Sequence, residues 1–180
     1  MNEYDEKTHT YRINGVIVPG VTSVLRSAGL IDTSWYTADC TTRGTYVHEA
    51  CALFDQDRLD WKSLDPRITP YVEGWAKFRK VMPVRFDVIE KQFWNEQYGF
   101  GGTIDRAWST TIVDIKTGAF PDWLALQLGG YSLLYPCVFA SGIRLNSNGK
   151  FSMKNIGPYE LGLARKQFLA ALEKVKNEQR

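Results

Sequence analysis

The sequence contains few cysteines and no long apolar run. Its 180 residues include three cysteines, Cys40, Cys51 and Cys137, which is an odd number with no close spacing. This set argues against a disulfide framework and a four-cysteine cluster, and it is typical of a reducing compartment. No apolar stretch approaches the roughly 20 residues that a membrane span requires, and the first residues lack the apolar core of a signal peptide. We therefore expect a cytoplasmic protein that does not enter a membrane.

The sequence also lacks a strong charge of either sign. The chain carries 22 Lys and Arg against 20 Asp and Glu, so its formal net charge is +2. Any affinity for nucleic acid must therefore come from a local basic patch. Hydrophobic residues make up 44% of the chain and charged residues 23%, as in an ordinary globular domain. We expect one domain over 1–180, large enough to bury a core, with the polar residues 1–10 loosely ordered.

Apolar periodicity predicts a mixed α/β fold. Helical spacing, with cap and proline signals, predicts helices over 21–28, 42–56, 66–80, 122–135 and from 158 onward. Alternation of apolar and polar residues predicts strands over 84–98, 101–108 and 111–118. Turns rich in asparagine and glycine predict two further hairpins, over 11–18 and 143–153. A break in alternation near Val88 indicates a bulge, and 34–40 fits either a helix or a loop. This order favours a central mixed β-sheet flanked by helices.

The segment 101–118 carries the most informative chemistry. Two apolar-rich runs flank a short polar turn, and each run holds one aspartate. If the runs pair across a two-residue turn, Asp105 lies opposite Asp114, with Cβ atoms about 4.5–5.5 Å apart. Two like charges so placed repel each other unless a cation or a proton separates them. Strand alternation puts Lys116 on the face of Asp114. The segment therefore predicts a divalent-cation site beside a lysine; the alternative is an exposed sheet face with an ordinary Asp–Lys pair.

Three other motifs accompany this hairpin. Pro19–Ser23 reads Pro-Gly-Val-Thr-Ser, Gly44–His48 is a Gly-x-x-x-His pattern, and Gln127–Tyr131 is a Gln-x-x-x-Tyr pattern. In this order the four elements resemble the PD-(D/E)XK nuclease superfamily, in its RecB-like and phage-type exonuclease branch. The resemblance covers roughly residues 16–135.

The resemblance implies a restriction-endonuclease-like core and a Mg²⁺- or Mn²⁺-dependent DNA exonuclease of phage-type recombination, repair or DNA processing. Hydrolysis would leave 5′-phosphates. Asp105, Asp114, His48 and the backbone carbonyl of Ile115 are the implied metal ligands. Both aspartates and Lys116 are the implied catalytic residues.

Further site candidates each have an ordinary alternative. Glu90 shares a predicted strand face with apolar residues, an unusual place for an unpaired carboxylate; it is a catalytic candidate unless a bulge turns it to solvent. Gln127 and Tyr131 either contact the DNA backbone, support the lysine, or form a polar stripe beside the core. Arg43 and Thr45 flank the predicted start of the histidine helix, where a phosphate is favoured.

Two other functions fit the same residues: a structure-specific or nicking endonuclease, and a non-catalytic DNA-binding or assembly module. The complete acidic, lysine and histidine set favours an enzyme. Some relatives hold an iron–sulfur cluster through four cysteines, and we expect none from three cysteines at other positions. DNA is the expected partner, and because no helicase motif is present, any unwinding would have to come from another protein. The resemblance leaves a strand-annealing or helicase partner and self-association open, and a phage origin would place the protein in the host cytoplasm.

Overall fold

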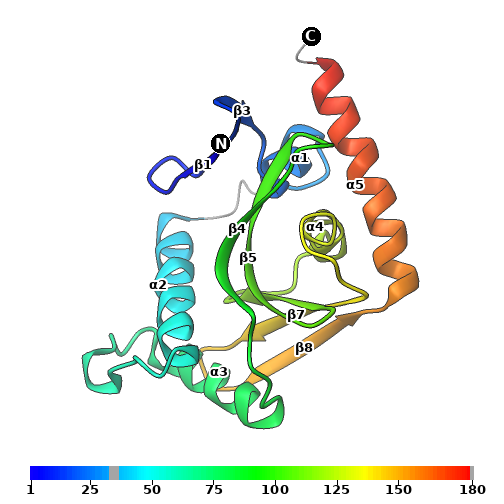
Figure 1. Ribbon diagram of the computed structural model, residues 1–180. Coiled ribbons are helices and arrows are strands. Elements are labelled where there is room, and N and C mark those ends of the chain that lie inside the picture. The colour runs from blue at the N-terminus through cyan, green and yellow to red at the C-terminus, as the bar shows by residue number, and fades with distance from the viewer. Residues whose placement is uncertain (33–36, 179–180) are drawn as a thin grey trace.

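The computed structural model describes residues 1–32 and 37–178 (Figure 1); residues 33–36, within the segment 34–40 that fits either a helix or a loop, lie outside this description. The described elements are, in chain order, β1 (Asn2–Asp5), β2 (Thr10–Ile13), β3 (Val16–Val18), α1 (Val21–Ser27), α2 (Ala38–Asp55), the 3₁₀ turn η1 (Trp61–Ser63), α3 (Thr69–Val81), β4 (Val88–Asn95), β5 (Phe100–Trp108), β6 (Thr111–Lys116), α4 (Leu124–Tyr131), β7 (Phe139–Leu145), β8 (Phe151–Ile156) and α5 (Pro158–Glu178).

A five-stranded mixed sheet forms the centre of the molecule. Its strand order is β4-β5-β6-β7-β8. The pair β6–β7 is parallel and the other pairs are antiparallel. A parallel pair needs a crossover connection, and α4 supplies it. These features confirm the predicted fold class, a mixed sheet flanked by helices.

The helices cover the two faces of the sheet with separate apolar cores. On one face, α1, α4 and α5 bury residues such as Leu25, Leu128 and Phe168. On the other face, α2 and α3 bury residues such as Val47 and Trp75. Figure 1 shows α2 on one side of β4 and β5, and α4 and α5 on the other side. The strands β4, β5 and β6 therefore lie between α2 and α4.

None of the helices in the described ranges combines the length and the apolar character needed to cross a bilayer.

A small three-stranded antiparallel sheet, β1-β2-β3, packs against the start of β5. Asn14 and Gly15 have φ of 50° and 80° and form the tight turn predicted between β2 and β3. The segment 1–10, expected to be loosely ordered, contains β1, because β1 pairs with β2 along its whole length. The Gly101 N–H donates to the Pro19 carbonyl over 3.0 Å, which ties this sheet to β5.

Three helices begin at other residues than predicted, and one of them, α4, spans Leu124–Tyr131 rather than 122–135. The helix of the histidine motif starts at Ala38 rather than near 42, because the Thr37 hydroxyl accepts the Cys40 N–H over 3.2 Å and caps it. The next helix starts at Thr69 rather than at Pro66. The Asp65 carboxylate accepts the Arg67 N–H over 2.8 Å, so Pro66 belongs to a turn before the helix.

The contact between α4 and α5 yields a stability prediction. A Cβ at Gly129 would lie 2.6 Å from the carbonyl carbon of Ala164 on α5. Gly129→Ala is therefore expected to lower the free energy of unfolding by about 1–3 kcal/mol through overpacking, despite a helix propensity gain of about 1 kcal/mol. Gly162→Ala is the matched control, because a Cβ there meets no atom of the described residues within 4 Å. The control should stabilise the protein in urea denaturation. Stabilisation by both variants would contradict the close approach of the helices.

Candidate active site

Three elements bring polar side chains together at the edge of the sheet, and a fourth adds a backbone carbonyl. His48 comes from α2, Glu90 from β4 and Asp105 from β5, and one ligand atom from each lies within 4.8 Å of the others. The His48 Nδ1 is 3.2 Å from Glu90 Oε1 and 3.7 Å from Asp105 Oδ2. The His48 Nε2 is 3.1 Å from the Ile115 carbonyl oxygen on β6. Both ring nitrogens thus face acceptor oxygens: the protonated ring can donate to both, and the neutral ring to one of them.

The paired strands β4 and β5 are distorted at this point. The sequence predicts a bulge near Val88, but the register is the same on both sides of Glu90. Instead, the pairing skips Glu90 and Asp105, and Glu90 has a φ of 46°. As a result, successive side chains of β5 no longer alternate between the two faces of the sheet: Asp105 and Arg106 both contact residues of α2. A non-glycine residue with left-handed backbone geometry costs about 1–3 kcal/mol. The hydrogen bonds that His48 and Arg106 make with the Glu90 carboxylate offset this cost.

Strands β5 and β6 follow the predicted register and then separate. Arg106 pairs with Val113, as a two-residue turn requires, but the pairing ends before Asp105 and Asp114. The Asp105 carboxylate instead accepts the Ile115 N–H over 2.7 Å. The two aspartates therefore do not form the directly opposed pair that the register predicts. Asp105 extends toward α2 and Asp114 extends toward α4.

The electrostatics of the cluster match its geometry. Burial alone favours the neutral imidazole of His48, but Asp105 and Glu90 outweigh it and raise the His48 pKa to about 9. Burial raises the pKa of Asp105 to about 7; His48 opposes this shift, while the charges of Glu90 and Asp114 add to it. A cation beside Asp105 would favour the ionised form of its carboxyl group and offset the charges of Glu90 and Asp114. The site fits a divalent metal ion on this ground.

A buried arginine, Arg106, pairs with the Glu90 carboxylate. The Arg106 side chain is fully buried, its Nε donates to Asp55 over 2.6 Å, and its Nη1 donates to Glu90 over 2.8 Å. Asp55, at the end of α2, also pairs with Arg79 over 2.8 Å and accepts the Trp75 indole N–H. This network fixes α2, α3 and β4 around the cluster. Sequence reasoning missed it, although a charged residue inside an apolar strand was a usable signal.

Lys116 lies on the other side of β6 from His48. Its Nζ is 2.7 Å from Asp114 Oδ2 and donates to Gln127 Oε1 over 2.9 Å. Gln127 in turn donates to the Tyr131 hydroxyl over 3.1 Å. Asp114 and Lys116 therefore share a face, as strand alternation predicts. Of the three alternatives for Gln127, these contacts agree with the one in which Gln127 supports Lys116.

A cavity of about 390 Å³ opens in front of the cluster. It is lined on the sheet side by Glu90, Gln92, Thr103 and Asp105, on the helix side by Gly44, Thr45, His48, Glu49 and Tyr131, and on the N-terminal side by Tyr4, Glu6 and His9. Thr45 therefore reaches the site, whereas Arg43 lines a separate cavity and lies 5.5 Å from the Tyr71 ring. Both residues lie in the second turn of α2, so the expected helix N-terminus is not beside them.

Three residues at this cavity, Tyr4, Glu6 and His9, come from the segment expected to be loosely ordered. The Tyr4 hydroxyl and His9 Nδ1 are 2.7 Å apart. Tyr4 packs on Tyr11, whose hydroxyl bonds Thr103 on β5 over 2.8 Å. Sequence reasoning missed Tyr4 and His9, because nothing in their spacing indicates that the first strand reaches the site.

Comparisons with known proteins are distant. No family model matches the chain, and no match was found among curated proteins. Among solved structures, the chain is similar to LHK-Exo, an alkaline exonuclease from Laribacter hongkongensis, in complex with dAMP (13% identity, 89% of each chain, TM-score 0.48). It is also similar to a phage related exonuclease from Haemophilus somnus 129PT (13% identity, 90% of this chain, 94% of that chain, TM-score 0.48) and to SSO0001 (16%, 78%, 71%, TM-score 0.43).

The buried arginine yields a second stability prediction. Arg106→Met leaves Asp55 and Glu90 without their shared partner, and loss of one member of a buried ion pair costs about 3–5 kcal/mol. We expect a corresponding fall in the free energy of unfolding measured in urea. The matched control is Arg67→Met, because Arg67 is 87% exposed and pairs with Asp65 at the surface. The control should leave stability close to that of the parent protein; equal effects of the two variants would refute the structural role of Arg106.

Proposed function

We propose that this protein is a divalent-metal-dependent DNA exonuclease. The observation that carries the proposal is the convergence of His48, Glu90 and Asp105 within 4.8 Å, with the Lys116 ammonium held nearby by Asp114. Carboxylates, a histidine and a lysine at one edge of a sheet suit hydrolysis of a phosphodiester. The order of these residues along the chain also resembles the phage-type exonuclease branch, which supports DNA ends as the substrate.

The donor atoms suit Mg²⁺ or Mn²⁺. Carboxylate oxygens of Glu90, Asp105 and Asp114 and the Ile115 carbonyl are hard ligands of the kind that these ions prefer. The imidazole of His48 suits Mn²⁺ better than Mg²⁺. Such an ion, when bound, supplies Lewis-acid activation of the phosphate and of the attacking water.

The side chains of the protein position the reacting groups. Lys116, fixed between Asp114 and Gln127, orients the attacking water or stabilises the charge that develops on the phosphate. Tyr131 fixes Gln127 through its hydroxyl. Attack of water on phosphorus with cleavage of the P–O3′ bond leaves the phosphate on the 5′ end of the product. The family resemblance suggests a role in recombination, repair or DNA processing of phage type, in the cytoplasm.

Binding of the ion should stabilise the fold. A ligand at about 100 times its Kd adds about 2.7 kcal/mol to the free energy of unfolding. We therefore expect the Tm of the metal-free protein to rise by several degrees on addition of Mn²⁺, measured by differential scanning calorimetry. Asp105→Asn should abolish the rise, and Asp65→Asn should preserve it, because Asp65 is a partly exposed aspartate outside the site. An unchanged rise in Asp105→Asn would exclude Asp105 as a ligand.

Loss of the lysine should remove catalysis without unfolding the protein. Lys116→Ala is expected to lower the rate of DNA hydrolysis by about 10²–10³-fold, the usual effect of losing one group that stabilises developing charge. Lys154→Ala, an exposed lysine on β8, is the matched control and should retain full activity. The assay follows end-labelled single- and double-stranded DNA in Mg²⁺ and in Mn²⁺. Full activity of Lys116→Ala would refute the assigned role.

The same assay separates the alternatives. An exonuclease degrades a linear plasmid and leaves the covalently closed circle intact. Nicking of the closed circle would instead identify a structure-specific or nicking endonuclease. Absence of hydrolysis of any substrate in either metal, with DNA binding retained, would identify a non-catalytic DNA-binding or assembly module.

A further inference from the structure

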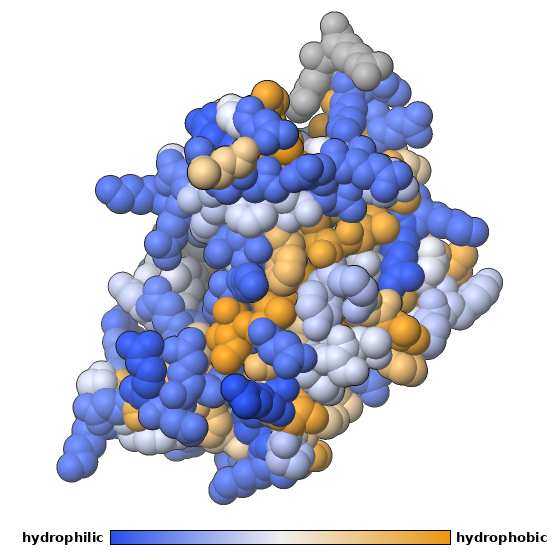
Figure 2. All heavy atoms as spheres, viewed as in Figure 1, coloured by the Kyte–Doolittle hydropathy of each residue, from blue (hydrophilic) through white to orange (hydrophobic). Residues whose placement is uncertain are grey.

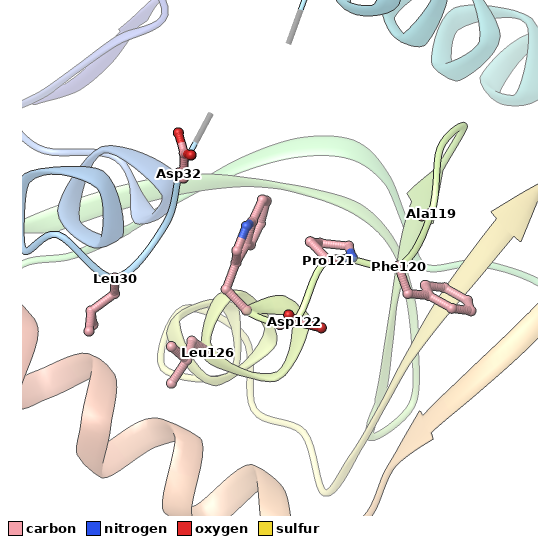
Figure 3. Close-up of a pocket in the computed structure, with 8 residues that line it drawn as sticks. Leu30, Asp32, Ala119, Phe120, Pro121, Asp122 and Leu126 are labelled. Carbon is pink, nitrogen blue, oxygen red and sulfur yellow. The ribbon is translucent and has the colours of Figure 1, made fainter. Parts of the chain in front are cut away.

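A second hollow lies beside Lys116, outside the cluster of His48, Glu90 and Asp105. Its volume is about 540 Å³, and it is lined by Leu30, Asp32, Ala119, Phe120, Pro121, Asp122, Trp123 and Leu126. Figure 2 shows apolar atoms gathered on this face over the position of α4, with hydrophilic residues around them. In Figure 3, Leu30 and Asp32 lie on the side of α1, Ala119 and Pro121 lie opposite them, and Leu126 lies on α4.

Trp123 joins this hollow to the candidate active site. The Lys116 Nζ lies 5.7 Å from the centroid of the Trp123 ring, a cation–π distance. The Gln127 N–H donates to the Trp123 carbonyl over 3.1 Å, so Trp123 occupies the helical position four residues before Gln127. Residues four apart lie on one helix face. Trp123, Gln127 and Tyr131 therefore form one stripe, which runs from the hollow past Lys116 to the cavity in front of His48.

The spacing of this stripe corresponds to between one and two nucleotides of a single strand. Four residues advance an α-helix by about 6 Å, whereas one nucleotide of a stacked strand advances by about 3.4 Å. Trp123 is thus within one or two nucleotides of a phosphate placed at Lys116. A single strand that crosses the site would therefore bring either a base or a neighbouring phosphate to the indole.

The chemistry of the hollow favours a base over a phosphate. Pro121, Leu126 and Leu30 provide an apolar lining, and Asp32 and Asp122 repel an anion. Carboxylate oxygens accept hydrogen bonds, and adenine and cytosine offer exocyclic amino groups as donors. We propose that this hollow binds the nucleobase of an unpaired nucleotide next to the cleaved bond, with Trp123 as its stacking surface. The proposal rests on the proposed nuclease function and names its substrate as a single strand or a frayed end.

A cycle of protein and substrate changes tests the proposal. The substrates are single-stranded oligonucleotides with an abasic residue at the first, second or third nucleotide from either end. With the wild-type protein, one abasic position should lower kcat/KM roughly tenfold, because stacking of one base contributes about this much. In Trp123→Ala the same abasic residue should have no further effect. Trp123→Phe keeps an aromatic ring and should retain most of the abasic effect. An equal abasic effect in wild type and Trp123→Ala would overturn the proposal.

Further measurements distinguish a failure of base binding from a failure of the proposed nuclease function. Thermal melts of both Trp123 variants identify any loss of fold, and comparison of the two substrates within one variant cancels a general loss of activity. If the wild type cleaves no DNA, the nuclease proposal fails, and fluorescence anisotropy then measures binding of the same labelled oligonucleotides. A roughly tenfold weaker affinity for the abasic strand in wild type but not in Trp123→Ala would still support base binding; equal ratios would exclude it.

Discussion

Balance between buried charges is the constraint on which this site depends. Asp55, Glu90 and Asp105 lie close together at low exposure, and isolated carboxylates there would each cost several kcal/mol. Arg106 and His48 provide the compensating charge, and each faces two of these carboxylates. The left-handed backbone at Glu90 is tolerated because both cationic partners hold its carboxylate. The distortion that brings Asp105 and Arg106 to the same face of the sheet is thus a consequence of charge pairing, and it also places Asp105 at the site.

The residues of the proposed site lie on two sides of β6. His48 approaches from the α2 side and contacts the Ile115 carbonyl, while Lys116 lies on the α4 side and is fixed by Gln127. Separation of β5 from β6 beyond Arg106 lets both groups reach one edge. The closeness of Gly129 to Ala164 on α5 holds α4 in place. Helix packing far from the reacting atoms therefore determines where the ammonium lies.

The sequence predicts the local relationships well, and it misses those set by long-range charge pairing. A two-residue turn and strand alternation are local rules, and they correctly gave the pairing of Arg106 with Val113 and the shared face of Asp114 and Lys116. The flip at Glu90 breaks alternation because of Arg106 and His48, which lie far away in the sequence. The helix start at Ala38 depends on one hydroxyl cap, which periodicity does not detect. Tyr4 reaches the site through Tyr11 and Thr103, a contact chain that no spacing rule contains.

Arg106 and Lys116 both pair with carboxylates of the site, but they differ in burial and therefore in the role that each can have. Arg106 is fully buried, so its charge is committed to Asp55 and Glu90, and its planar fork suits that fixed double contact. The Lys116 side chain is 18% exposed and its ammonium is held at the edge of the sheet. A compact ammonium on a flexible stem can follow a phosphate as charge develops on it, which a guanidinium fixed between two buried carboxylates cannot do. Arg106 holds the framework, whereas the proposed function gives Lys116 its role at the phosphate, so exchange of either residue for the other should not preserve its role.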